Sequence, residues 1–175
     1  MALLEIVKFP APVLRKKTKP VTHFSDPKLE TLISDMAQTM YAAPGVGLAA
    51  NQVGLSLRLA VIDADWKEEE GKKNLRVFIN PILLEKSDPV PFEEGCLSLP
   101  SLTAQTRRFN KVTVQYQDLQ GTIKTLSAEG LLAVALQHET DHLDGKLYID
   151  RLSSLKKELL IKKFKKLSEE RNSSQ

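Results

Sequence analysis

The sequence has little cysteine, few histidines and no long apolar run, and the first and last of these shortages each exclude a class of protein. A single cysteine, Cys96, cannot form an intramolecular disulfide, which excludes a disulfide-stapled secreted scaffold. No apolar stretch approaches the roughly 20 residues that cross a membrane. The apolar start is interrupted by Glu5 and Lys8 and lacks the cleavage pattern of a signal peptide. We therefore expect a protein of a reducing, cytoplasmic compartment that makes no membrane contact.

The chain also lacks a strong excess of either charge. Its formal net charge is +3, which argues against sequence-specific nucleic-acid binding by the chain as a whole. One segment departs from this balance. Residues 151–171 contain eight basic and three acidic side chains, a local charge of +5. The C-terminal segment therefore needs an explanation of its own.

The length of 175 residues suits a single domain, residues 1–175, with a buried core. Hydrophobic spacing and capping residues predict the elements. Helices are expected from Asp26 to about residue 43, from Ser127 to a stop at Gly145, and over 153–170; strands are expected over 57–64, 76–84, 111–118 and 122–126. The charged residues 67–73 are expected to form a hairpin loop, residues 88–91 a turn, and residues 172–175 a disordered end.

This grouping of strands predicts an α+β fold of mainly antiparallel sheet, because a parallel sheet needs strands and helices to alternate. The sheet is expected to pack around a central metal-binding helix. An N-terminal helix and an amphipathic, basic C-terminal helix complete the prediction.

The central helix contains the most informative pattern of the sequence. His138 and His142 are four residues apart, so a helix places both on one face, with Glu139 beside them. H-E-x-x-H is typical of a metal-dependent hydrolase. Ordinary helix histidines with a surface glutamate would match it too. The apolar residues before His138 favour a metal, because they direct the motif into a core.

A catalytic site of this kind needs a third protein ligand. In some metallopeptidases the third ligand is a later glutamate, and the glutamates after His142 are Glu158, Glu169 and Glu170, all in the basic terminal segment. Cys96 is the remaining candidate, although a lone cysteine beside leucines is more often a small buried apolar residue. A Cys-His-His set suits Fe(II) as well as Zn(II).

A glycine-rich stretch, residues 45–54, has neither the lysine of a phosphate loop nor the spacing of a dinucleotide fingerprint. It fits a backbone that another chain approaches closely, with Gln52 as its polar tip. A plain tight turn fits equally well.

Three blocks of sequence, taken in order, resemble the signature motifs of the bacterial-type peptide deformylases. They are Gly45-Val46-Gly47-Leu48-Ala49-Ala50-Asn51-Gln52, Glu94-Gly95-Cys96-Leu97-Ser98 and Gln137-His138-Glu139-Thr140-Asp141-His142. The similarity extends over nearly the whole chain. It implies hydrolysis of the formyl group from N-formylmethionyl nascent peptides with release of formate.

The resemblance implies a role for each residue. Cys96, His138 and His142 would bind the metal, natively Fe²⁺ in this family, with Zn²⁺ or Ni²⁺ able to replace it. Glu139 would move the proton, while the Gln52 amide and the Leu97 backbone N–H would hold the developing oxyanion. Substrate-binding residues by similarity are Val46, Gly47, Phe92, Glu94, Leu131, Val134 and Ala135.

Further implications concern neighbouring positions. Glu94 and Arg108 are expected to form an ion pair. Two residues depart from the family pattern: Thr103 replaces an arginine that many bacterial members have, and Arg107 stands where proline is common. These departures leave the substrate preference beyond the methionine open and do not concern the chemistry.

Three alternatives stay open. The chain could be a metallopeptidase with an acidic third ligand, or a non-catalytic binding protein that a metal stabilises. The basic terminal helix could be a solvated face or a contact to ribosomal RNA. The protein could be bacterial and cytoplasmic, or organellar with its transit peptide missing.

Overall fold

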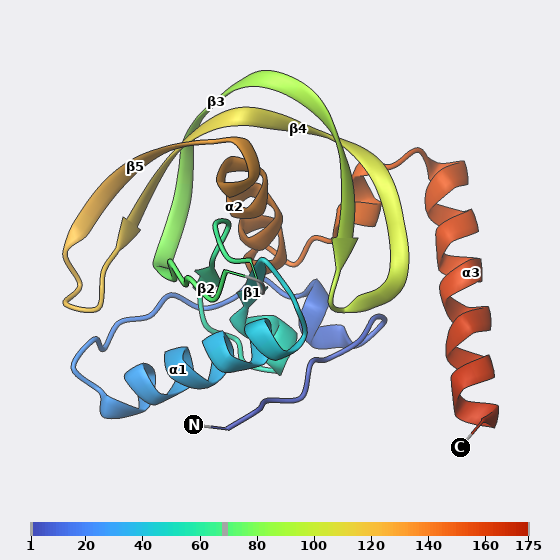
Figure 1. Cartoon of the computed structure of the whole chain (residues 1–175), viewed down its shortest axis with the longest axis horizontal. Coiled ribbons are helices and arrows are strands. Elements are labelled where there is room, and N and C mark those ends of the chain that lie inside the picture. Colours follow the sequence, from blue (N-terminus) through green and yellow to red (C-terminus); the bar gives the residue numbers. More distant parts are fainter. Residues whose placement is uncertain (1, 68–69, 175) are drawn as a thin grey trace.

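The computed structural model describes residues 2–67 and 70–174. In chain order its elements are η1 (Pro12–Arg15), α1 (Pro27–Ala42), β1 (Gly47–Ala49), η2 (Ala50–Val53), β2 (Leu59–Ile62), β3 (Arg76–Cys96), β4 (Leu99–Gln117), β5 (Ile123–Glu129), α2 (Gly130–Leu143), η3 (Tyr148–Arg151) and α3 (Ser154–Ser173). Figure 1 shows β3, β4 and β5 arching over α2, with α1 below and α3 upright at one side. The α+β prediction is confirmed.

The five strands form one antiparallel sheet in the order β1-β2-β3-β4-β5. β3 and β4 are 21 and 19 residues long and pair along most of their length. Register shifts between Ile79 and Ile82 and between Leu83 and Glu85 interrupt the pairing. Because such bulges bend a strand and increase its twist, the long hairpin can curve over the central helix.

Helix α2 lies in the core and carries the H-E-x-x-H motif. Its residues from Ala133 to Leu143 are buried, with the exception of His138. The Gln137 side chain donates to the backbone oxygen of Phe109 at 2.7 Å and accepts from its N–H at 3.0 Å, which ties α2 to β4. Gly145 follows the helix with φ +75°, and a Cβ there would lie 2.6 Å from the carbonyl oxygen of Arg15. Only glycine satisfies both conditions.

The other two helices pack on different parts of the sheet. The Asp26 carboxylate caps α1 by accepting from the Lys28 N–H at 2.9 Å, as its position before Pro27 predicted. Met36 and Met40 of α1 are fully buried against β1 and β2 in one apolar cluster. Phe164 of α3 is buried in a second cluster around the β3–β4 hairpin tip and η3. The terminal helix is thus docked on the core through one face.

Several boundaries differ from the prediction. Residues 88–91 continue β3 instead of forming a turn, although Asp88 has φ +61°. Ser127 pairs with Thr113 inside β5 and does not cap α2, which begins at Gly130. Helix α3 extends to Ser173, so the predicted disordered end is helical at Asn172 and Ser173.

The charged segment 67–73 lies between β2 and β3, as predicted for a loop, and its described residues 67 and 70–73 are exposed. Glu68 and Glu69 lie outside the described residues. None of the helices in the described ranges has both the length and the apolar character needed to traverse a bilayer.

Candidate metal centre and substrate pocket

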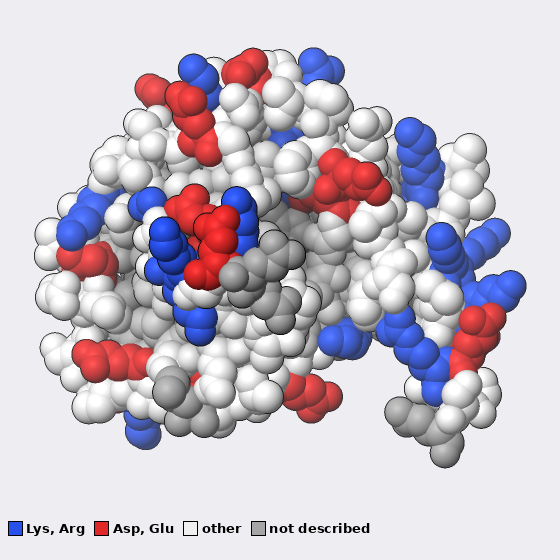
Figure 2. All heavy atoms as spheres, in the orientation of Figure 1, with Lys and Arg blue, Asp and Glu red and all other residues white. Residues whose placement is uncertain are grey.

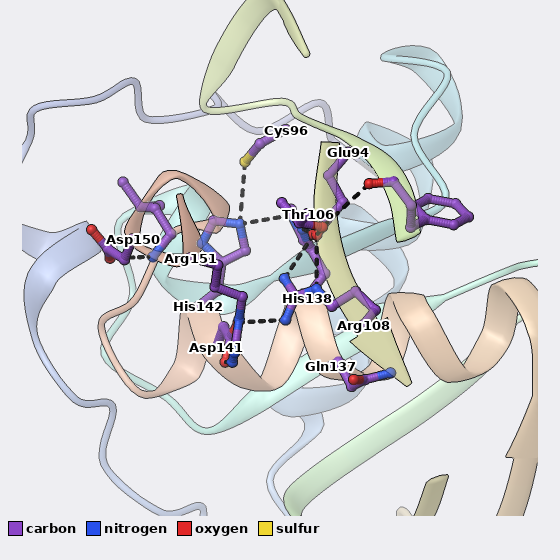
Figure 3. A network of polar contacts seen from close by, with 12 residues as sticks. Glu94, Cys96, Thr106, Arg108, Gln137, His138, Asp141, His142, Asp150 and Arg151 are labelled. Carbon is purple, nitrogen blue, oxygen red and sulfur yellow. Dashed lines mark hydrogen bonds and ion pairs between the residues drawn. The ribbon is translucent and has the colours of Figure 1, made fainter. Parts of the chain in front are cut away.

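Three potential metal donors converge where the end of β3 meets α2 (Figure 3). The Sγ of Cys96 lies 3.2 Å from Nε2 of His142, and that nitrogen lies 3.1 Å from Nε2 of His138. All three donor atoms lie within 4.8 Å of one another. Among the described residues this is the one group of three or more His, Cys, Asp or Glu side chains so arranged. The downstream glutamates of α3 are not part of it.

This arrangement fits a divalent metal. Nδ1 of His138 lies 2.8 Å from Oε1 of Glu94, so its Nε2 is directed toward the other two donors. A carboxylate that orients a ligating imidazole through the second ring nitrogen is the usual support of a metal site. One thiolate and two imidazoles suit first-row metals such as zinc and iron.

A buried charge network supports the donors (Figure 3). The Arg108 guanidinium is 1% exposed and binds both Glu94 oxygens, from Nε and Nη2, at 2.7 Å each. Its Nη1 donates to Oδ2 of Asp141 at 2.7 Å, and Arg151 binds both Asp141 oxygens. The network joins β3, β4, α2 and η3 around the site. It confirms the predicted Glu94–Arg108 ion pair.

The network keeps Glu94 ionised. Burial alone would raise the pKa of this carboxyl, but hydrogen bonds from His138 and Arg108 lower the pKa well below its usual range. The Thr106 hydroxyl donates a further bond to Oε2. Glu94 was predicted among the substrate-binding residues; in the structure its two oxygens are engaged by the protein itself.

Glu139 is a second carboxylate beside the donors and, unlike Glu94, forms no ion pair with the other described residues. Its Oε2 is buried and has no hydrogen-bond partner among the described residues. Burial, partly offset by the nearby His138, raises the pKa of this carboxyl to about 7. A group with a pKa near neutrality can both accept and return a proton.

Gln52 is fixed at the opposite wall. Its Oε1 accepts from the Ala49 N–H at 3.0 Å, which orients the side-chain amide. The amide nitrogen then lies 3.2 Å from Oγ of Ser98 and 3.6 Å from Sγ of Cys96. A hydrogen-bond donor is therefore held beside the donor cluster in advance of any ligand.

A cavity of about 690 Å³ opens in front of these groups. All predicted catalytic, metal and substrate-binding residues line it except His142, which is buried behind it: Val46, Gly47, Gln52, Phe92, Glu94, Cys96, Leu97, Leu131, Val134, Ala135, His138 and Glu139. The wall away from the donors is mostly apolar, as is usual for a ligand pocket, with a few polar groups.

Comparison with known proteins agrees with this site. The model of the family described as polypeptide deformylase matches residues 3–158. The chain belongs to this family. A peptide deformylase of Desulfotalea psychrophila is 49% identical over 166 residues, covering 95% of this chain and 97% of that protein.

Solved deformylases share the fold as well. The crystal structure of a peptide deformylase from Legionella pneumophila is 44% identical with a TM-score of 0.88, and the match covers 98% of each chain. A peptide deformylase from Ehrlichia chaffeensis, solved in complex with actinonin, is 37% identical with a TM-score of 0.86, covering 95% of this chain and 98% of that one.

Two features of this deformylase site were not predicted. Asp141 lies inside the third signature block, yet its role depends on Arg108 of β4, far away in sequence, and on Arg151 of η3. The sequence feature that could have indicated this role is the position of Asp141 three residues after His138 in the same helix. Ile6 and Lys8 also line the cavity. No local pattern in the N-terminal segment predicts that contact.

Proposed function

We propose that this deformylase hydrolyses the formyl group of N-formylmethionyl peptides through Cys96, His138, His142, Glu139 and Gln52. The convergence of one thiol and two imidazoles carries the proposal, together with a buried glutamate whose Oε2 has no hydrogen-bond partner among the described residues. Cys96, His138 and His142 would hold a divalent metal, which would supply Lewis acidity and lower the pKa of a bound water. We propose Fe²⁺ as the native ion on the ground of the family resemblance, and the mixed sulfur and nitrogen donors would also accept Zn²⁺ or Ni²⁺.

The chain's own residues handle the proton and the developing charge. Glu139 accepts the proton of the attacking water and passes it to the departing amine of the methionine. The Gln52 Nε2 donates to the carbonyl oxygen of the formyl group as negative charge builds there. The backbone N–H of Leu97, next to Cys96 in the cavity wall, is proposed as the second donor. Glu94 positions His138 and does not touch the reacting atoms.

The peptide is proposed to extend along β1, whose outer edge is unpaired because β1 is the first strand of the sheet. The methionine side chain would enter the apolar part of the cavity, between Val46, Phe92, Leu131, Val134 and Ala135. We also propose that actinonin, the compound bound by the Ehrlichia chaffeensis relative, occupies this same cavity and competes with the peptide.

The test is a formate assay on protein purified without oxygen, with the metal content measured in the same samples. We expect formate from a formyl-Met tripeptide, loss of that activity with a chelator, and recovery on addition of Fe²⁺ or Ni²⁺. Activity that a chelator leaves unchanged, or no formate at full metal content, would refute the proposal.

We further propose that α3 contacts the ribosome. The lysines that gather along α3 are seen in blue at one side of Figure 2. Lys162, Lys163, Lys165 and Lys166 are exposed, and two leucines beside them, Leu155 and Leu159, are 67% and 57% exposed. Clustered lysines bind the phosphate backbone in a salt-dependent way.

Deleting the helix would be a poor test, because it would remove the buried Phe164 from the core. Changing Lys162, Lys163 and Lys166 to glutamate preserves that contact. We expect the triple variant to lose salt-sensitive co-sedimentation with ribosomes while its formate release from a free peptide is unchanged. Equal co-sedimentation of both proteins would exclude the contact.

Residues 1–175 are proposed to act as one catalytic domain in the cytoplasm, where nascent formylated chains occur and a cysteine ligand stays reduced. The same properties suit an organelle with its own translation. Fractionation of cells that contain the tagged natural protein distinguishes the two.

A further inference from the structure

Among the residues that the structure describes, one exposed cation lies on the cavity wall, and it comes from the N-terminal segment. Lys8 lines the cavity together with Ile6. Two backbone bonds fix this segment. The Val7 N–H donates to the backbone carbonyl oxygen of Gln52 at 2.7 Å, and the Phe9 N–H donates to the backbone carbonyl oxygen of Ser98 at 2.9 Å. Alternate residues of an extended segment face opposite sides. Ile6 and Lys8 are therefore presented to the cavity by neighbours anchored in the catalytic blocks.

The charges around Lys8 leave its ammonium available. The two carboxylates in the cavity wall are buried: Glu94 is held by Arg108, and Glu139 lies at the donor cluster. Lys8 is exposed and takes part in none of the ion pairs formed by the described residues. Thr103, which also lines the cavity, is uncharged and donates to Glu93 outside the lining at 2.9 Å.

We propose that Lys8 is a specificity-determining residue that favours substrates with a carboxylate side chain, Asp or Glu, shortly after the formylmethionine. The inference rests on the proposed function. The methionine fills the apolar depth of the cavity, and the residues that follow it must pass the exposed wall to reach solvent. A carboxylate there meets the Lys8 ammonium, whereas a lysine or arginine is repelled by it.

The expected effect is modest because the pair is exposed to solvent. An exposed ion pair changes a binding ratio by about two- to fivefold. Salt should reduce the preference, because the screening length falls to about 3 Å at 1 M ionic strength. An apolar contact with the lysine stem would not respond to salt in this way.

The test uses formyl-Met tetrapeptide amides with alanine at the other positions. Asp, Asn or Lys is placed in turn at the second, third and fourth residue, so that Asp provides the single carboxylate. The kcat/KM ratio of each Asp peptide to its Asn counterpart is measured for the wild type, Lys8→Met and Lys8→Glu. Lys86→Glu is the control, since it makes the same charge change on an exposed part of β3 outside the cavity wall.

We expect the wild-type ratio to exceed one, by about two- to fivefold, at one or more positions. It should approach one in Lys8→Met, fall below one in Lys8→Glu, and be unchanged in Lys86→Glu. A ratio that is the same in the wild type and both Lys8 variants would overturn the proposal. A preference for Lys peptides in the wild type would do so too, since Glu93 would then dominate.

The failure of the proposed function gives a different result. In that case the wild type releases no formate from the all-alanine peptide, whatever the charge at later positions. If the all-alanine peptide is deformylated and the ratios do not respond to Lys8, the activity stands and the specificity proposal alone is wrong.

Discussion

The carboxylate of Glu94 lies 2.8 Å from Nδ1 of His138, and this single contact links the end of β3 to the centre of α2. Two strands separate the two residues in sequence. The contact directs the other nitrogen of the imidazole toward Cys96 and His142, while Arg108 keeps the carboxylate ionised. Metal affinity should therefore depend on a residue that is not itself a ligand.

Glu94→Gln should weaken metal binding about 10- to 100-fold, the usual effect of removing the partner of a ligating histidine. The neutral amide also leaves the buried Arg108 with less compensating charge. Metal retained against a competing chelator measures the change. Glu93→Gln, one residue earlier and exposed, is the control and should retain metal like the wild type.

Cys96→Ala should remove the third metal donor and, with it, both bound metal and formate release. The substitution separates a deformylase from a metallopeptidase with an acidic third ligand, which would keep its metal without the thiol. Metal analysis of the purified variant is the measurement. A variant with a full equivalent of metal would show that an acidic residue completes the site.

Gly47→Ala should impair the reaction through Glu139 while leaving the fold intact. A Cβ at position 47 would lie 2.5 Å from Oε1 of Glu139, so the carboxylate must move. Displacing a catalytic group by about 1 Å can cost on the order of 100-fold in rate. We expect kcat to fall by about that factor with normal metal content and thermal stability. Unchanged kcat would mean that Glu139 acts from another position.

Asp150→Asn should reduce stability at neutral pH but not in acid. Burial alone would raise the pKa of Asp150, but bonds from Arg15, the Leu147 N–H and Lys157 lower it. The stabilisation is therefore present above the unfolded pKa of about 3.9 and is lost as pH falls through the lower, folded value.

We expect Asp150→Asn to cost about 1 kcal/mol at pH 7, or about 2–4 °C in Tm, with the difference shrinking below about pH 4. Thermal unfolding at a series of pH values measures this. Glu158→Gln, at an exposed position without an ion pair among the described residues, should follow the wild-type curve. A Tm difference that is constant with pH would exclude the charge as its cause.

The local parts of the fold could be predicted from sequence, and the long-range parts could not. Asp26 and Pro27 mark the start of α1 because capping is a local interaction. Residues 88–91 look like a turn, yet pairing with β4 extends the strand through them. Pro89 and Pro91 fall on one edge of a strand that has β4 as its single neighbour there, so their missing N–H groups leave the ladder intact.

The donor cluster was predictable because helical spacing fixes His138 and His142 and the family resemblance adds Cys96. The cavity wall followed from the same resemblance. The ion pair between Arg108 and its second partner, Asp141, could not be predicted, because a buried charge network depends on how β4, α2 and η3 meet. Lys8 was missed for the same reason: its neighbours Val7 and Phe9 are held by backbone bonds to residues far away in sequence, Gln52 and Ser98.

The division of the metal donors between β3 and α2 has a consequence for how the protein matures. In an unfolded chain at most two of the three ligands, the histidines, can bind one metal together, since the segments of β4 and β5 lie between them and Cys96 in sequence. The thiol arrives only when the long hairpin has closed over the helix, which makes tight metal binding a product of folding. Tight metal binding therefore distinguishes correctly folded molecules from misfolded ones. A molecule with a misplaced hairpin would bind no metal tightly and would be inactive.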